Sequence, residues 1–329
     1  MKRNIVISSG DPGGVGAQVI IKAINKILKK GFLLDKYNIV LLGDKGYYEY
    51  LCGEMGLDKF WERVLEPAEV CGSGELNGVV IVDFKNVDDY RLGETGASYG
   101  RASIKYLEYA IHLYKRGLLW VLLTAPICKK SLWDAGYRYA GHTHYLAVKL
   151  KRRNVIMSML SRKLKVFFAT DHVSFKAVPM LLTELRIKRT IQSAVECLKL
   201  LKVERIRIAV CSLNPHAGEG GIFGNEEEAI LSACEHWLNR GVEIVGPISP
   251  EVCFKRAVND DFGAVVVMYH DQGMIPFKLF SKGEGINVTW GLPFIRISPE
   301  HGTAFDIAKS FIANESSMLN AFYFAMENF

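Results

Sequence analysis

Short runs of β-branched and aliphatic residues recur along the chain and predict the strands of a sheet. Residues 265–268 contain no polar position, a pattern typical of a strand buried on both faces. The predicted strands span residues 4–9, 37–43, 78–84, 118–126, 164–170, 205–213, 242–247 and 263–270.

Between these runs the apolar residues follow a helical spacing. In residues 98–117 the apolar positions 104, 107, 111 and 114 form one stripe, and Gly117 fits a left-handed cap. Asn225 and Glu228 have the spacing of a capping box at the start of another helix. Strands that alternate with helices predict an α/β fold with mostly parallel sheets. Since no Pro/Gly/Ser-rich linker divides the chain, two lobes would be joined by crossing strands.

Composition narrows the class of protein. The chain has 329 residues, 49% hydrophobic and 23% charged, which suits a globular protein of two α/β lobes. No apolar run approaches the roughly 18 residues that span a bilayer, and the start does not fit a signal peptide. The seven cysteines are scattered without a C-x-x-C pair, so no disulfide framework or zinc knuckle is indicated. We therefore expect a cytoplasmic protein with no membrane partner.

The net charge of +6 raises the question of a nucleic-acid partner. The basic residues are spread through the chain, and the one dense cluster, residues 149–154, is typical of a solvated helix end. We therefore expect no nucleic acid. A mildly basic protein with a cleft suits small anionic substrates better.

A glycine-rich segment, residues 8–19, follows a predicted strand and opens a predicted helix. No Lys-Ser/Thr pair follows, so it is not a Walker A loop, and Val19 stands where the dinucleotide fingerprint needs its third glycine. Two interpretations remain: a tight turn that needs positive φ, or a loop that lines the active cleft. A conventional Rossmann domain is not supported.

Three histidines follow predicted strands: His172, His216 and His270. Ligands of open α/β sheets collect beyond the carboxyl ends of the strands, and three imidazoles there suit a borderline divalent ion with open positions for substrate. A single histidine is more often a packing residue, as we expect for His112 and His236. Spacing alone leaves both interpretations open. The neighbours able to orient the three rings are Asp171, Asn214, Asp271 and Gln272.

A second group of residues suits an anionic ligand. Lysine and arginine bind phosphate or carboxylate by charge-assisted hydrogen bonds, and the other members fix orientation. Together they predict the walls of a pocket for a small diacid or phosphoacid. The group comprises His142, Thr143, Lys278, Asn287 and Arg296.

Several motifs resemble, in order and along nearly the whole chain, the 4-hydroxythreonine-4-phosphate dehydrogenase family of pyridoxal phosphate biosynthesis. The most specific are NPHAGEGG, MYHDQG, and GLPFIR followed by HGTA. The resemblance implies a fold like that of isocitrate and isopropylmalate dehydrogenases: two α/β/α lobes with a cleft, in a homodimer with the active site near the interface. On this basis we expect residues 1–125 plus 285–329 on the nucleotide side. Residues 126–284 would carry the metal, substrate and dimer contacts.

The resemblance also implies an activity. The family oxidises 4-phosphooxy-L-threonine with NAD or NADP and one divalent ion, for which we consider zinc, magnesium and cobalt. Its product is 2-amino-3-oxo-4-phosphooxybutanoate, which decarboxylates to 3-amino-2-oxopropyl phosphate. By position the metal ligands are His172, His216 and His270, and the substrate contacts are His142, Thr143, Lys278, Asn287 and Arg296. Asp271 and Lys278 are candidates for a proton relay, and Glu300, His301, Thr303 and Asp306 for contacts to the dinucleotide.

The chain departs from the family pattern at four positions that carry no implied ligand: Gln18, Cys128, His144 and Lys309. These departures bear on substrate preference. One alternative is a dehydrogenase of the same fold for another phosphorylated hydroxy acid, such as a phosphothreonate, or for an aromatic dihydrodiol carboxylate. Others are a three-histidine zinc hydrolase and a non-catalytic phospholigand-binding protein.

Overall fold

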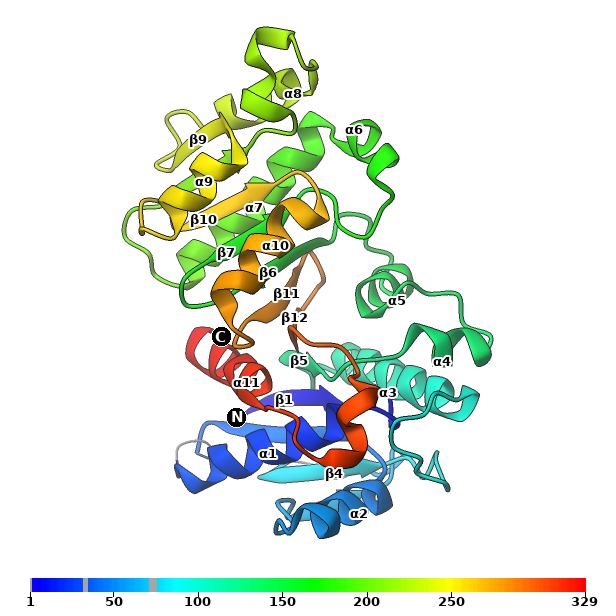
Figure 1. The fold of residues 1–329 in the computed structure, drawn as a ribbon. Helices are drawn as coiled ribbons and strands as arrows, with labels where there is room; N and C mark the ends of the chain where they lie inside the picture. Colours follow the sequence, from blue (N-terminus) through cyan, green and yellow to red (C-terminus); the bar gives the residue numbers. More distant parts are fainter. Residues whose placement is uncertain (1, 32–34, 71–75) are drawn as a thin grey trace. The chain divides into compact units, whose positions relative to one another are not determined.

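The chain forms two compact units in the computed structural model, which describes residues 2–31, 35–70 and 76–329 (Figure 1). The first unit holds the described residues up to 153 together with 292–327 and 329, and the second holds 154–291 and 328. Two ranges differ from the expected lobes. Residues 126–153 pack in the first unit, because Leu132, Tyr145 and Leu146 are buried in its core. Residues 285–291 belong to the second unit, where residues 286–290 pair with residues 156–160. No helix of the described residues is long and apolar enough to cross a membrane.

The first unit is built on a parallel sheet with the strand order β3-β4-β2-β1-β5-β12. Val6 and Val40 face a core that includes Ile104 and Leu107 of helix α3. Ile5 and Ile7 alternate with Val6 and are also fully buried, so both faces of the sheet are covered. The elements are β1 (Arg3–Ser8), α1 (Gly16–Lys29), β2 (Tyr37–Gly43), α2 (Lys45–Met55), β3 (Arg63–Leu65), β4 (Val79–Asp83), α3 (Ala97–Lys115), β5 (Val121–Thr124), α4 (Lys129–Asp134), α5 (His142–Lys149), β12 (Ile295–Pro299), the 3-10 helix η3 (Phe305–Ser310) and α11 (Ser316–Asn328).

The second unit has a mixed sheet with the order β11-β6-β7-β10-β8-β9. Strands β7, β10, β8 and β9 are parallel, whereas β6 runs antiparallel to both β7 and β11. Its core joins these strands to Phe254 of α9 and Phe277 of α10. The elements are β6 (Ile156–Leu160), β7 (Lys165–Phe168), η1 (Phe175–Ala177), α6 (Val178–Leu181), α7 (Glu184–Leu200), β8 (Arg207–Cys211), η2 (Pro215–Gly221), α8 (Glu226–Glu235), β9 (Glu243–Ile248), α9 (Pro250–Ala257), β10 (Ala264–Val267), α10 (His270–Ser281) and β11 (Ile286–Trp290).

Candidate active site

The three predicted metal-binding histidines follow the carboxyl ends of three adjacent parallel strands of the second unit. His172 follows β7, His270 follows β10 and His216 follows β8, and β10 pairs with both of the other strands. The carboxyl ends of these strands therefore meet at one edge of the sheet, as the sequence pattern predicts. This is the edge at which α/β proteins bind ligands.

Two of the three imidazoles lie together. The ring centroids of His172 and His270 are 5.1 Å apart. His270 Nδ1 is 2.7 Å from Asp271 Oδ1, a contact that orients the ring and leaves Nε2 for another ligand. The pair therefore has the donor chemistry for a divalent ion.

The residues after His270 fix the end of strand β10 and the start of helix α10. Gln272 Oε1 accepts a hydrogen bond from the Met268 amide at 2.7 Å, and its Nε2 donates to the Ser212 carbonyl at 2.7 Å, which ties the end of β10 to the end of β8. A Cβ on Gly273 would lie 2.7 Å from Val166 Cγ1, so only glycine lets α10 pack this closely on the sheet. His270 is thus held at the first residue of a firmly anchored helix.

His216 lies in an exposed loop with unusual backbone geometry. Residues 216–220 all have positive φ, although His216, Ala217 and Glu219 carry a Cβ and disfavour that region. Glu227 holds the start of this loop: its Oε1 accepts from the amides of Leu213 and Asn214 at 3.0 and 2.8 Å. Its Oε2 accepts from Asn214 Nδ2 at 2.8 Å.

The three histidines do not form one metal-binding group within the chain. Among the residues that the structure describes, no three His, Cys, Asp or Glu side chains are placed to hold an ion together. His172 and His270 fit a divalent ion as two of its ligands, and the participation of His216 stays a prediction.

Two hollows of the second unit adjoin the histidine pair. One of about 230 Å³ is lined by His172, His270 and Asp271. A second, of about 460 Å³, shares Phe175, Val178 and Tyr269 with the first. It extends to Asn214 and Pro215, where the loop of His216 begins. The space beside the pair therefore reaches the loop that carries the third histidine.

The remaining predicted residues of this unit lie on α10 and β11. Lys278 is exposed about two turns along α10 from His270. Asn287 lies in β11 opposite Met159 of β6, and its Oδ1 is buried without a hydrogen-bond partner.

The predicted anion-binding residues of the first unit include two deeply buried groups. Arg296 of β12 is 4% exposed, and burial lowers its pKa to about 9, so it stays charged at neutral pH. His142 is 8% exposed at the first residue of α5. Burial, and then the nearby charge of Arg296, lower the pKa of His142 well below its usual value. Its Nε2 is buried without a hydrogen-bond partner, and Thr143 follows it in the first turn of α5. A buried guanidinium near a helix N-terminus suits a phosphate or carboxylate.

The glycine-rich segment packs against residues 300–315, the segment after β12, which we call the tail. Gly10 has φ +74°, which confirms the tight-turn interpretation at that residue. A Cβ on Gly14 would lie 2.8 Å from the Thr303 carbonyl oxygen, and the amide of Val15 donates to that oxygen at 2.9 Å. A Cβ on Gly13 would lie 2.0 Å from the carbonyl oxygen of Glu94. These glycines therefore admit protein backbone rather than a phosphate group.

The four predicted dinucleotide contacts lie in this tail. The Glu300 amide donates to Ser317 Oγ at 2.8 Å, and His301 Nδ1 is 2.9 Å from the Gly302 carbonyl oxygen. Asp306 is exposed on η3, where its carboxylate can accept hydrogen bonds from the hydroxyl groups of a ribose.

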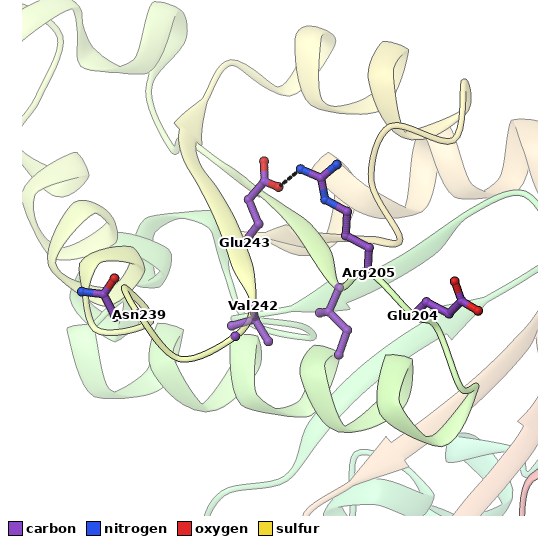
Figure 2. Close-up of a pocket in the computed structure, with 7 residues that line it drawn as sticks. Glu204, Arg205, Asn239, Val242 and Glu243 are labelled. Atoms are coloured by element: carbon purple, nitrogen blue, oxygen red, sulfur yellow. Dashed lines mark hydrogen bonds and ion pairs between the residues drawn. The ribbon is translucent and has the colours of Figure 1, made fainter.

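A further hollow of about 300 Å³ lies at the amino-terminal ends of β8 and β9 (Figure 2). There Arg205 and Glu243 form an ion pair of 2.9 Å. This hollow holds none of the predicted site residues and lies at the edge of the sheet opposite the histidines. It is therefore a poor candidate for the active site.

Comparison with known proteins identifies the family. The family described as pyridoxal phosphate biosynthetic protein PdxA matches residues 12–325. The chain belongs to this family. A relative from Aquifex aeolicus, named 4-hydroxythreonine-4-phosphate dehydrogenase, is 38% identical over 98% of this chain and 97% of its own length. A protein of Oceanobacillus iheyensis, provisionally named D-threonate 4-phosphate dehydrogenase, is 37% identical over 98% and 97%.

Solved structures agree with the PdxA assignment. The crystal structure of 4-hydroxythreonine-4-phosphate dehydrogenase from Klebsiella pneumoniae covers 99% of both chains with a TM-score of 0.81 and 34% identity. An isocitrate dehydrogenase from Methylococcus capsulatus is similar in fold alone, at a TM-score of 0.51 and 14% identity over 99% and 85%. The predicted family, the α/β fold class and the oxidoreductase class are confirmed.

Sequence reasoning missed residues that position the candidate site. Glu227 anchors the loop of His216, and the Thr124 hydroxyl accepts a hydrogen bond from Arg296 Nε at 2.8 Å. Thr124 ends strand β5, the same kind of position that singled out the histidines. Its position near the end of a predicted strand could therefore have identified Thr124 as a candidate.

Proposed function

We propose that the protein oxidises 4-phosphooxy-L-threonine to 2-amino-3-oxo-4-phosphooxybutanoate in pyridoxal phosphate biosynthesis, with NAD or NADP as the acceptor. The product loses carbon dioxide to give 3-amino-2-oxopropyl phosphate. The observation that carries the proposal is the His172–His270 pair at the carboxyl edge of parallel strands. The match to the PdxA family over residues 12–325 supports it.

His172 and His270 would hold one divalent ion, with zinc, magnesium and cobalt as candidates, and Asp271 would fix the ring of His270. When bound, such an ion lowers the pKa of a coordinated hydroxyl group, here the 3-hydroxyl of the substrate. A nicotinamide ring supplies the acceptor for the hydride of C3, and Thr303, Asp306, Glu300 and His301 are the candidates to contact the dinucleotide.

The anionic end of the substrate would be bound by charged and polar side chains. Arg296 supplies a buried positive charge, and His142 and Thr143 supply polar atoms at the start of α5. Lys278 and Asn287 are the other residues for which we propose substrate contacts. Asp271 and Lys278 are the candidates to carry the proton of the 3-hydroxyl to solvent.

We further propose a homodimer, with the active site near the interface. Several apolar side chains beside the histidines are exposed: Phe175 (71%) and Met180 (84%) follow His172, and Ile222 (75%) follows His216. Exposed apolar surface of this kind is typical of interfaces. A two-fold dimer in which the partner subunit's His216 joins the His172–His270 pair would account for its separation from that pair within one chain.

A cytoplasmic location is part of the proposal. The six cysteines in the described residues are all free thiols, as is usual in a reducing compartment, and Cys71 lies outside those residues.

The test combines metal analysis of the purified protein with NADH or NADPH production from 4-phosphooxy-L-threonine. His216→Ala should lose both metal and dehydrogenase activity while it stays folded, whereas His236→Ala, an exposed histidine of the same unit, should keep both. An active, metal-free His216→Ala protein would contradict the assignment. Turnover of an ester without any nucleotide would favour a zinc hydrolase.

A second substrate is supported by the comparable identity to the Oceanobacillus protein, 37% against 38% for the Aquifex protein. Threonate 4-phosphate carries a hydroxyl group where phosphooxythreonine carries the 2-amino group. The ratio of kcat/KM for D-threonate 4-phosphate and 4-phosphooxy-L-threonine decides between them.

A further inference from the structure

One face of helix α1 contacts the tail of the first unit along most of its length. Gln18, Lys22 and Lys26 are spaced by four residues, so they lie on the same side of the helix. Figure 1 draws the tail, in orange and red, beside α1. Gln18 Nε2 donates to the Ala308 carbonyl at 2.7 Å. Lys22 Nζ donates to the carbonyls of Phe311 and Ala313 at 2.7 and 2.8 Å, and Lys26 pairs with Glu315.

The tail has a backbone that needs such support. Ala304 and Phe311 flank η3, and both adopt positive φ, +44° and +56°, although each carries a Cβ. Such conformations persist only where surrounding contacts fix them, and they concentrate at ligand-binding segments. The amide of Val15 fixes the start of the tail through the Thr303 carbonyl, and Lys22 fixes its end through the carbonyl of Phe311 itself.

The three side chains of this face differ in environment. Gln18 is fully buried, Lys22 is half-buried, and the side chain of Lys26 is 57% exposed. Lys22 donates to two backbone carbonyls, including that of Phe311, whereas Lys26 pairs with the side chain of Glu315, which lies beyond the segment with positive φ. Lys22 is therefore the main cationic contact between α1 and the tail.

We infer that Lys22 is a positioning residue for dinucleotide binding. The inference rests on the proposed function, in which Thr303 and Asp306 of the tail contact the dinucleotide. Lys22 acts through the tail: its ammonium group holds residues 304–311 in the form that binds the ligand. If only a fraction of the molecules keeps the tail in that form, the apparent Kd for the dinucleotide is the intrinsic Kd divided by that fraction.

The experiment compares Lys22→Met with Lys29→Met, at an exposed lysine of the same helix, as the matched control. NADH and NADPH are titrated by fluorescence, and hydrogen exchange is followed in residues 303–313. Lys22→Met should weaken dinucleotide binding by about tenfold, since two charge-assisted hydrogen bonds are lost, and should lose protection in the tail. Lys29→Met should stay within about twofold of the unsubstituted protein.

Two further measurements separate positioning from a general loss of structure. Lys22→Arg keeps the charge and the donors, so it should restore most of the affinity. In the Lys22→Met protein, KM for the phosphorylated substrate should change by less than about twofold while KM for the dinucleotide rises about tenfold. If Lys22→Met does not fold, Lys22→Gln, which keeps a donor, serves in the same comparison.

The outcomes distinguish the positioning role of Lys22 from the proposed function on which it rests. Equal dinucleotide affinity in the Lys22→Met and unsubstituted proteins would overturn the positioning role alone. Loss of protection throughout the first unit, with no selective effect on the tail, would also overturn it. Failure of the unsubstituted protein to bind either dinucleotide would overturn the proposed function.

Discussion

Arg296 Nε donates a hydrogen bond of 2.8 Å to Thr124 Oγ1, and both side chains are buried. Arg296 is the second residue of β12 and pairs with Leu122 of β5 in a parallel register, and Thr124 ends β5 two residues further along. The bond from Nε fixes the direction of the guanidinium plane. Among the proposed substrate contacts of the first unit, Arg296 carries the strong positive charge. The Thr124 hydroxyl therefore controls the direction in which its guanidinium group points.

Thr124→Val should weaken substrate binding. Valine keeps the shape of threonine but accepts no hydrogen bond, so the buried guanidinium loses one partner. We expect KM for the phosphorylated substrate to rise by about tenfold or more, from the roughly 1.5–3 kcal/mol of a hydrogen bond to a charged group, while kcat changes less. Steady-state kinetics check this, with Thr124→Ser as the control that retains the hydroxyl. Unchanged KM in the valine variant would contradict the role of Thr124.

Asp11 of the glycine-rich segment should make stability depend on pH. It is 1% exposed, and burial raises its pKa from 3.8 to about 6. The folded state therefore binds this proton more tightly than the unfolded state does. The contribution of Asp11 to stability is fully present below about pH 4 and is lost as the pH rises to about 6 and beyond.

Asp11→Asn removes this dependence, because asparagine does not ionise and can still accept the hydrogen bond that Gly13 donates at 2.9 Å. The difference in unfolding free energy between the variant and the unsubstituted protein should grow in favour of the variant by up to about 3 kcal/mol between pH 4 and pH 7. Urea denaturation at several pH values measures it. Asp58→Asn, at an exposed position, is the control. A constant difference across this range would contradict the assignment.

Most of the fold could be predicted from the pattern of apolar residues. All eight predicted strands are present, and the strand predicted at residues 37–43 has the bounds of β2. Four strands of the described residues were not predicted: β3, β6, β11 and β12. Strand β6, with the sequence IMSML, has one β-branched residue in five. Strand β3 is only three residues long, and β11 and β12 carry polar residues such as Asn287 and Arg296 that were interpreted as pocket walls.

Helix caps were less predictable. Gly117 does adopt positive φ after α3, as its position predicts. Asn225 precedes α8 (Glu226–Glu235), but its side chain caps no amide. Whether a side chain caps a helix depends on competing contacts with other segments. Beside Asn225, the carboxylates of Glu226 and Glu227 both accept a hydrogen bond from Asn214 of the preceding loop.

The candidate site could be predicted only in part, because some of its contacts join segments that are far apart in the sequence. Strand order places the residues that follow β7, β10 and β8 at one edge, so the proximity of His172 and His270 could be expected from position alone. The left-handed loop of His216 depends on a distant carboxylate, Glu227, which no local pattern reveals. Contacts between remote segments, such as Lys22 with Phe311, are likewise absent from any periodicity.

Glu227→Ala should loosen the loop that carries His216. The variant loses the acceptor for the amides of Leu213 and Asn214, so the strained turn at residues 216–220 loses its support. We expect a loss of about 1–3 kcal/mol in unfolding free energy, faster hydrogen exchange in residues 214–221 and a lower metal content. Glu228→Ala, at an exposed neighbouring position, should stay within about 0.5 kcal/mol. Equal exchange rates in the two variants would argue against an anchoring role.

Gly273→Ala should disturb the position of His270 through packing. The added Cβ would lie 2.7 Å from Val166 Cγ1 and 2.8 Å from Phe168 Cε1, both buried in the core of the second unit, so α10 has to move away from β7. We expect a loss of about 1–3 kcal/mol in unfolding free energy together with weaker metal binding, because His270 begins the same helix.

Gly53→Ala is the matched control for this effect. Gly53 lies inside helix α2, and a Cβ there would meet no atom within 4 Å. Alanine should therefore stabilise the protein by about 0.4–1 kcal/mol, chiefly by restricting the unfolded chain. Thermal denaturation with metal analysis measures both variants. Because the substitution is the same, an opposite sign of the two stability changes isolates the close approach of α10 to the sheet as the cause. A Gly273→Ala protein with unchanged stability and metal content would show that His270 does not depend on that approach.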